Sequence, residues 1–534
     1  MKFNGVSWLK KDYEKTAFCL LFVIMAIYYG YRMFGLTPWY DELYTYYYFI
    51  SRGPVYAAIH WPLPNNHVGY SVLSGFLDYL GNPYIGLRGV SYLCALANLL
   101  LLFAIGRKFF RRGLSLVAVI FYLSMHLVNQ LAIQGRGYTL GITCYLTAFY
   151  CLTVICRQEN TAGRYYVLYA LSLTMGIYTI TSNVYWVLPL CLAGGIYLLF
   201  LAMTRSEGEK WWKSIFAGKL FRLIAASLIA AAMTTFLYAM IWLAIGANLL
   251  VKEESGAYFG MGHMSVILQA PFEAIRTGIQ YMLATPYIQS VEREGFLNRL
   301  GHWFMSLFDW YYDGLAMVIL AVVLIGGIYL IYQLARAMRR KEEEKLLLLL
   351  FLLTGMVCMP LILLVQCALP YYRVFAYAGI LLALLLTVLM EKLTVAGKHA
   401  NTVLFLVILI FGISRFFLGN YQDQYGEREY QIEDALAHCD LKKGQEKRVL
   451  CVTDCDQQYL LKFLYGITCE NTQIEGAEAV LLDQRMTDPQ FDEMIWEFYQ
   501  YYDTIPWEYI HSNLTKTYEN EGFVLYTKMK SKGD

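Results

Sequence analysis

Residues 37–88 read TPWYDELYTYYYFISRGPVYAAIHWPLPNNHVGYSVLSGFLDYLGNPYIGLR and separate two long apolar segments of the chain. The stretch contains an adjacent pair of acids, Asp41 and Glu42, an Asn-Asn-His triplet at 65–67 and a terminal arginine, Arg88. Ionisable groups at or inside a membrane are costly, and those that occur there usually serve a function. We therefore expect a functional site in this stretch, at the boundary between membrane and water.

The composition of the whole chain indicates a membrane protein. Of its 534 residues, 58% are hydrophobic and only 16% are charged, whereas soluble domains carry about 25% charged residues. Several apolar windows are long enough for a helix to cross a hydrocarbon core of about 30 Å. Clear examples are 18–33, 90–105, 220–245, 346–364 and 403–417. The sequence predicts an all-α polytopic membrane protein, and nothing in it suggests nucleic-acid binding.

The distribution of basic residues predicts the orientation. Lys and Arg cluster in alternate gaps between the apolar windows, for example at 107–112 and 336–345. Because cytoplasmic loops are enriched in these residues, we expect about eleven spans with the N-terminus inside and residues 37–88 outside. Tyr70–Leu80 is apolar, but a span there would reverse the orientation of the 107–112 cluster. We therefore predict a juxtamembrane helix at that position.

Two outer segments have recognisable local patterns. Residues from Tyr40 onward suit a short helix, on which Asp41 and Glu42 point about 100° apart and so have different partners. Asn65 or Asn66 is placed to cap a following surface helix that begins near His67. A third segment, Ala247–Tyr312, is a long outer loop without obvious structure, and loops of this kind are often either functional lids or disordered.

The composition changes near residue 420, so two domains are expected: a transmembrane domain at 1–419 and a small soluble α/β domain at 420–534. In the second domain the pattern predicts helices at 426–438 and 457–465 and strands at 448–453, 479–482 and 522–528. On the predicted topology this domain also lies outside the cell.

Several short motifs occur in a characteristic order: Tyr-Asp-Glu-Leu-Tyr at 40–44, Asn-Asn-His at 65–67, Leu-Arg-Gly-Val-Ser at 87–91, Gln-Gly-Arg-Gly-Tyr at 134–138 and Tyr-Arg-Val-Phe at 372–375. Over about residues 16–420 the chain resembles the C-type (GT-C) membrane glycosyltransferases, in the bacterial group related to protein O-mannosyltransferases and lipid A aminoarabinose transferases. The resemblance implies transfer of a sugar from a polyprenyl-phosphate carrier to an acceptor outside the cytoplasmic membrane.

Under that resemblance Asp41 is the predicted general base, since one carboxylate within hydrogen-bond reach can take the proton of an acceptor hydroxyl. The departing phosphate is already acidic, so no second acid is needed, and the reaction inverts the anomeric centre. Glu42 would orient Asp41 or share a divalent cation with it, although no ligand set demands a metal. The simpler alternative is that both acids cap and solvate a short helix.

The predicted substrate-binding residues lie at the outer ends of spans. Arg88 and Arg373 are expected to bind the phosphate, because guanidinium groups suit this anion, and Arg136 to bind phosphate or sugar; interfacial snorkelling is the alternative for each. The His67 side chain, with Asn65 and Asn66, is predicted to contact the phosphate or a sugar hydroxyl, and a purely structural histidine is the alternative. A sugar ring is predicted to stack on Tyr44, Tyr138 and Tyr372, and packing at the membrane interface is the alternative for these tyrosines.

The predicted function is therefore inverting transfer of a hexosyl or pentosyl group to a cell-envelope glycan, lipid or protein. A flippase or transporter of lipid-linked sugars is the main alternative, and a membrane anchor for a polymer-binding tail is a third. Transporters tend to show internal repeats and charges near the membrane midplane. Here the ionisable residues gather at one face, which favours the enzyme.

Overall fold

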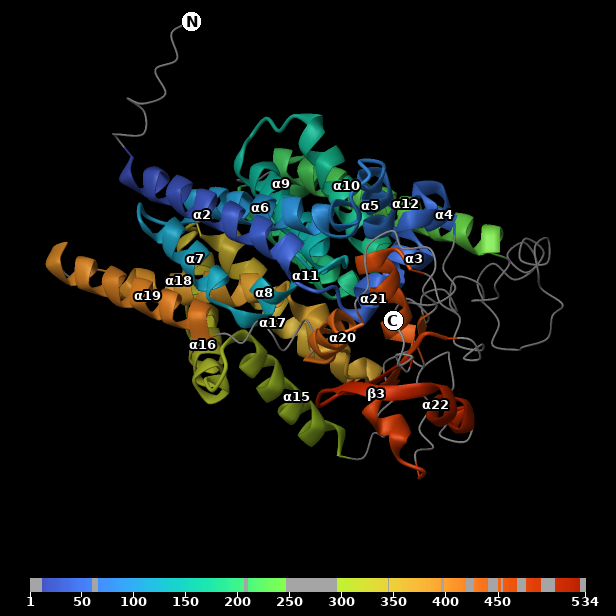
Figure 1. Cartoon of the computed structure of the whole chain (residues 1–534). Coiled ribbons are helices and arrows are strands. Elements are labelled where there is room, and N and C mark those ends of the chain that lie inside the picture. The colour runs from blue at the N-terminus through green and yellow to red at the C-terminus, as the bar shows by residue number, and fades with distance from the viewer. Residues whose placement is uncertain are drawn as a thin grey trace, which may run out of the picture.

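The structure is a computed structural model of the whole chain (Figure 1). It describes residues 12–59, 66–205, 210–245, 295–343, 345–394, 398–418, 427–439, 450–452, 455–467, 477–490 and 505–528.

The transmembrane domain is a bundle of helices. In the described part of the chain, eight helices are long and apolar enough to cross a membrane: α2 (Tyr13–Gly35), α6 (Pro83–Phe109), α9 (Tyr138–Arg157), α11 (Val184–Thr204) with the preceding turn η2 (Thr181–Asn183), α12 (Ile215–Ile245), α16 (Ala316–Arg340), α17 (Leu346–Gln366) and α19 (Lys398–Leu418). The other three predicted spans are shorter helices: α7 (Leu114–Leu123), α10 (Gly163–Thr179) and α18 (Ala378–Leu393). The polytopic helical class is confirmed.

The bundle is held together by small residues where helices approach closely. A side-chain carbon added at Gly106 of α6 would lie 3.0 Å from the Ser115 backbone of α7. One added at Gly176 of α10 would lie 2.5 Å from the buried ring of Trp186 on α11. In lipid, where water does not drive helices together, such close packing supplies much of the attraction between them. The ends of these spans are thereby fixed relative to one another.

Short helices gather where the predicted outer segments lie: α3 (Tyr40–Tyr48), η1 (Ile50–Arg52), α4 (Pro54–Ile59), α5 (Val68–Asp78), α8 (His126–Leu131), α15 (Phe296–Tyr311) and η5 (Tyr372–Phe375). The predicted short helices at 40–48 and after His67 are confirmed as α3 and α5. At 11 residues, α5 is too short to span a bilayer.

The predicted loop at Ala247–Tyr312 is corrected in its last part, because residues Phe296–Tyr311 form the helix α15. Leu300, Trp303 and Leu307 repeat at helical spacing and are buried against the bundle, which stabilises an amphipathic helix. The preceding residues, 246–294, lie outside the described part of the chain.

The C-terminal domain is a small α/β unit. Its four-stranded sheet has the order β1-β2-β4-β3, with β1 parallel to β2 and the other neighbours antiparallel. The strands are β1 (Leu450–Val452), β2 (Ala479–Asp483), β3 (Leu514–Glu519) and β4 (Phe523–Lys528), and the helices are α20 (Glu427–Ala437), α21 (Cys455–Tyr465), α22 (Trp507–Asn513) and the short turn η7 (Gln484–Thr487). The sequence prediction missed β3 and α22. Strand β3 is largely exposed and polar, so it lacks the apolar alternation of a half-buried strand.

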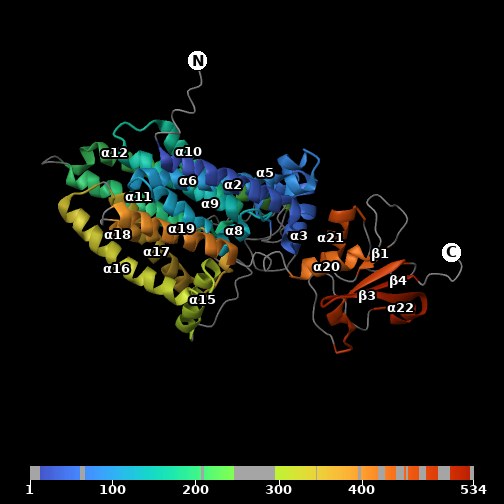
Figure 2. The same ribbon diagram turned by 60° about the vertical axis from the view of Figure 1, so that its left-hand side comes forward.

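The C-terminal domain lies against helix α3 (Figure 2). Tyr459 of α21 stacks on Tyr47 of α3 with ring centroids 5.6 Å apart. Phe463, one turn further on, meets Tyr46 edge-on at 5.5 Å. The hydroxyl of Thr37, just before α3, donates a hydrogen bond to Glu433 of α20. Helix α3 is therefore packed between the bundle and the C-terminal domain.

Candidate active site

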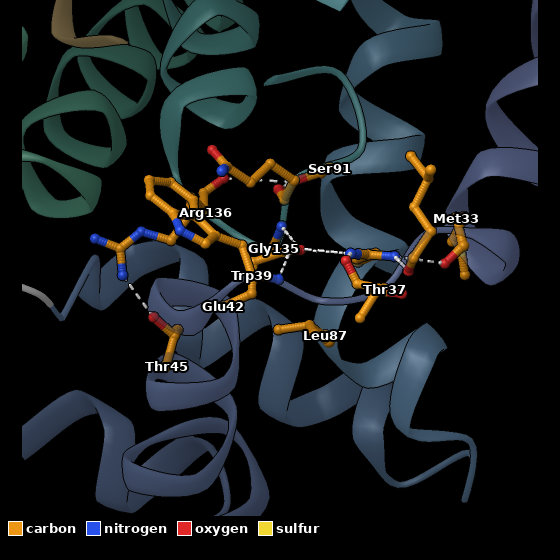
Figure 3. Close-up of polar contacts among 12 residues, drawn as sticks. Met33, Thr37, Trp39, Glu42, Thr45, Leu87, Ser91, Gly135 and Arg136 are labelled. Carbon is orange, nitrogen blue, oxygen red and sulfur yellow. Dashed lines mark hydrogen bonds and ion pairs between the residues drawn. The ribbon is translucent and has the colours of Figure 1, made fainter. Parts of the chain in front are cut away.

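The first turn of α3 is anchored by a buried ion pair (Figure 3). Glu42 Oε1 accepts hydrogen bonds from Arg88 Nε at 2.8 Å and from the Gly135 N–H at 2.6 Å. Glu42 Oε2 accepts from Arg88 Nη2 at 2.8 Å and from the Trp39 N–H at 3.0 Å. Two donors on each oxygen use the acceptor capacity of a carboxylate. Glu42 therefore joins α3 to α6 and to the 134–138 segment.

Arg88 is committed to the same network, which corrects its predicted role as a phosphate ligand. Its side chain is fully buried, and Nη1 donates to the carbonyls of Met33 and Leu36 at 3.1 and 2.6 Å. Nη2 also donates to the Thr37 carbonyl at 3.4 Å. With its donors directed into the protein, Arg88 has no face toward a ligand. We assign Arg88 and Glu42 to positioning the first turn of α3.

Asp41 has a different partner from Glu42, as their separation on the helix predicts. Its Oδ2 lies 3.1 Å from Nη1 of Arg373 in the turn η5. The two side chains are 12% and 23% exposed, respectively. Residues more than three hundred positions apart thus meet where α3 follows α2 and η5 follows α17. The predicted convergence of the acid with an arginine from a distant span is present.

Arg136 and His67 lie next to Asp41. Arg136 Nη1 donates to the Thr45 hydroxyl at 2.6 Å and to the Asp41 carbonyl at 3.3 Å. Its Nη2 is 3.4 Å from His67 Nε2. His67 Nδ1 accepts a hydrogen bond from the Gly137 N–H at 2.9 Å, so in the neutral ring the proton is on Nε2. Two N–H donors therefore lie side by side in this buried position.

The neutral form of His67 is favoured by its surroundings. Burial lowers the pKa of His67 well below its usual value, and the charges of Arg136 and Arg373 lower it further. The neutral ring, with its proton on Nε2, is therefore the favoured form of His67.

Protonation of His67 should make stability fall with acid. The pKa is depressed in the folded state, so the stabilisation is present above the ordinary pKa of about 6.5 and is lost as pH falls below it. Relative to His67→Asn, in which the amide oxygen replaces Nδ1 as acceptor, the wild type should lose about 1 kcal/mol between pH 7.5 and 5.5. Thermal unfolding in detergent at both pH values would measure this, and equal losses in the two proteins would contradict it.

Two glycines allow the 134–138 segment to approach its neighbours. A side-chain carbon at Gly135 would lie 2.5 Å from Leu87 and 3.1 Å from Glu42 Oε1. One at Gly137 would lie 2.4 Å from Thr179 and 3.1 Å from His67. Both N–H groups bond the side chains that these carbons would push away. The two glycines that flank Arg136 are visible in the sequence, but only these contacts show why a side chain is not tolerated at either position.

Gly137→Ala should therefore displace His67 and lower the rate of any reaction at this site by about 100-fold, since a shift of about 1 Å in a reacting group can reduce the rate by that factor. The matched control is Gly195→Ala on α11, where an added carbon meets nothing within 4 Å. The control should keep wild-type turnover. Comparable loss in both variants would indicate a general effect on the bundle and not one on the site.

Aromatic rings surround Arg373. Its Cζ lies 5.1 Å from the ring centre of Trp39, 4.8 Å from that of Tyr371 and 5.9 Å from that of Tyr138. Tyr138 also contacts the His67 ring edge-on at 5.0 Å, so it lies between the two. Trp39 and Tyr371 were missed by the sequence analysis, although each is next to a motif that it used.

The other predicted tyrosines have packing partners. Tyr44 is buried and stacks on Tyr48 with centroids 4.2 Å apart, so we assign it to the packing of α3. The ring centroid of Tyr372 lies 5.7 Å from that of Trp303 and 6.1 Å from that of Trp310. Its predicted contact with a sugar stays a prediction.

Asn66 has a structural role. Its amide nitrogen donates to the Ala57 carbonyl at 3.2 Å and its oxygen accepts from the Ser71 hydroxyl at 2.7 Å, which ties α4 to α5. The predicted cap of α5 is corrected, because His67 occupies the cap position and no side chain caps the helix. Asn65, the other predicted residue, lies outside the described part of the chain.

Among the residues that the structure describes, no group of three or more His, Cys, Asp and Glu side chains is placed to hold a metal ion. Glu42 already accepts two hydrogen bonds on each oxygen. The predicted alternative of a cation shared between Asp41 and Glu42 therefore does not fit this arrangement.

Comparisons with known proteins bear on the fold. The family described as dolichyl-phosphate-mannose-protein mannosyltransferase matches residues 68–232. A search of curated proteins returned no match. The crystal structure of ArnT from Cupriavidus metallidurans bound to undecaprenyl phosphate aligns over 97% of this chain and 99% of its own, with 12% identity and a TM-score of 0.50.

The archaeal oligosaccharyltransferase AglB from Archaeoglobus fulgidus, in complex with an inhibitory peptide and a dolichol-phosphate, aligns over 90% of this chain and 70% of its own. Its identity is 11% and its TM-score 0.46. At such low identity the ArnT alignment concerns the fold alone. The chain is a multi-pass membrane protein with the C-type glycosyltransferase fold, which confirms the resemblance drawn from its motifs.

Proposed function

We propose that this protein is an inverting glycosyltransferase that moves a sugar from a polyprenyl-phosphate carrier to an acceptor on the outer face of the cytoplasmic membrane. The observation that carries the proposal is the meeting of Asp41 with Arg373 at 3.1 Å, beside the donor pair formed by Arg136 and His67. An acid for the acceptor and N–H donors for a phosphate thus lie together in one site.

Asp41 would act as the general base. The acceptor oxygen attacks the anomeric carbon, its proton passes to the Asp41 carboxylate, and the bond from that carbon to the phosphate oxygen breaks. The phosphate leaves with the electron pair of that bond. A phosphate needs no proton to depart, so a single carboxylate suffices. One direct displacement inverts the anomeric centre, unlike the two-step reaction of retaining glycosidases.

Arg136 and His67 would hold the phosphate. Arg136 Nη2 and the protonated Nε2 of His67 are both donors, so at 3.4 Å they do not bond each other. A phosphate oxygen between them would accept from both. Charge-assisted bonds of this kind are about twice as strong as neutral ones. Arg373, whose charge also acts on His67, would be a further cation for the same anion.

The proposed location of the site on the outer face is supported by the contacts at the two ends of helices α2 and α6. Near the site, Arg88 bonds the Met33 carbonyl at 3.1 Å. At the other ends of the same two helices, Arg107 pairs with Glu14 at 2.7 Å. Arg107 belongs to the basic cluster at 107–112, which the positive-inside rule assigns to the cytoplasm. The site, at the opposite end, would then face outward.

The donor would be a polyprenyl-phosphate sugar whose lipid tail lies among the spans. The acceptor would be a cell-envelope glycan, lipid or protein, and the transferred group a hexose or pentose. The test is to incubate purified protein with a panel of polyprenyl-phosphate sugars radiolabelled in the sugar, together with a membrane extract that supplies the acceptor, and to follow release of free polyprenyl phosphate. Release from at least one donor, absent in Asp41→Asn, is expected. No release from any donor would count against the proposal.

A further inference from the structure

We propose that the Asp41–Arg373 ion pair is a lock on the base, which an anionic donor opens by drawing Arg373 onto its phosphate. The base is then available only when the donor is bound, so the donor binds before the acceptor is deprotonated. This inference rests on the proposed function and adds an order of events to it.

The two ion pairs on α3 differ in how fully they are satisfied. Glu42 and Arg88 are fully buried, and the carboxylate accepts four hydrogen bonds. Asp41 and Arg373 share one close contact, between Oδ2 and Nη1, and both side chains are partly exposed. The first pair is suited to hold α3 in place. The second can separate with fewer hydrogen bonds lost.

Arg373 has donor capacity that Asp41 does not use. Its Nε is buried and has no hydrogen-bond partner among the described residues, and an unsatisfied buried donor is unfavourable. A phosphate has enough oxygens to accept from several N–H groups of one guanidinium. Exchange of Asp41 for a phosphate would therefore satisfy more of Arg373.

The aromatic rings provide a surface along which Arg373 can move. Trp39, Tyr371 and Tyr138 all face its guanidinium within 6 Å, and an aromatic face stabilises a cation without fixing its rotation. Tyr138 also contacts His67, so movement over that ring leads toward the donor pair formed with Arg136. Arg373 would thus stay stabilised between its two anionic partners.

The lock has a thermodynamic consequence. If Asp41 and the phosphate compete for Arg373, removing the charge of Asp41 must strengthen phosphate binding. Couplings between sites of this kind typically change affinity by about 5- to 150-fold. A polyprenyl phosphate without sugar should therefore bind Asp41→Asn roughly tenfold more tightly than wild type, even though this variant cannot catalyse transfer.

The experiment is a calorimetric titration of purified full-length protein with a short-chain polyprenyl phosphate, which measures the dissociation constant. It is carried out for wild type, Asp41→Asn, Arg373→Gln and the double variant. Loss of a negative charge near an anion would also tighten binding without any movement of Arg373, and that effect would persist when Arg373 is glutamine. The lock instead predicts that Asp41→Asn tightens binding only when Arg373 is present.

Equal affinity of wild type and Asp41→Asn, or equal tightening in both backgrounds, would overturn the lock. Either result would leave the proposed function intact if the wild type binds the lipid and turns over a sugar donor. Failure of the wild type to bind the lipid at all would instead count against the proposed function. Asp313→Asn, which alters an exposed acid outside the site, should bind as the wild type does.

Discussion

Asp41→Asn is expected to lower sugar transfer by about 100- to 10,000-fold, the usual contribution of a positioned general base. Asparagine has nearly the same shape but does not take a proton from an acceptor hydroxyl. The glutamate–arginine network beneath α3 does not involve the Asp41 side chain, so the variant should remain folded. Turnover of a labelled donor and the thermal unfolding midpoint, measured on the same preparation, would check both statements.

The matched control is Asp313→Asn, the same change at an exposed acid before α16. It should retain wild-type turnover and stability. Full activity of Asp41→Asn would remove Asp41 as the base. A large fall in its unfolding midpoint would mean that the loss of activity reports on folding and not on chemistry.

Glu42→Gln is expected to destabilise the protein by about 3–5 kcal/mol, the cost of leaving a buried charge without its partner. The glutamine would present an amide group to Arg88, which has only donors. The Trp39 and Gly135 N–H groups would compete for a single remaining oxygen. Because Trp39 and Gly135 lie close to Asp41 and Arg136 in the sequence, sugar transfer should be lost together with stability.

Glu343→Gln provides the control for this prediction. Glu343 pairs with Arg205 at 2.8 Å in a contact that is substantially exposed, and exposed pairs contribute about 0–1 kcal/mol. The yield of monodisperse protein and the unfolding midpoint should fall for Glu42→Gln and stay near wild type for Glu343→Gln. If Glu42→Gln were as stable as wild type, the buried pair would not be what holds α3.

Part of the site could be predicted because the motifs are local. The adjacent acids on a short helix imply two different partners, and Asp41 and Glu42 do have them. An arginine at an outer helix end indicates a functional group in a costly place, and Arg373 and Arg136 both lie beside Asp41. In these cases the chemical type of the residue and its predicted place at a helix end carried the information.

Arg88 shows where such reasoning fails. It has the same residue type and the same predicted depth as Arg373, yet it is fully buried and bound to Glu42 and three carbonyls. The difference depends on which direction each side chain takes from its helix. That direction follows from the packing of α2 against α6 and is not encoded in the motif itself. The aromatic contacts of Trp39 and Tyr371 escaped prediction for the same reason.

The amino-acid sequence by itself determined the membrane class, the order of most spans and the identity of the acid on α3, because hydrophobic length, charge placement and helical periodicity act locally along the chain. Only the tertiary structure decided which arginine supports the scaffold and which one faces Asp41. Those roles depend on hydrogen-bond directions and burial between segments as distant as α3 and η5, and these arise only when the helices pack.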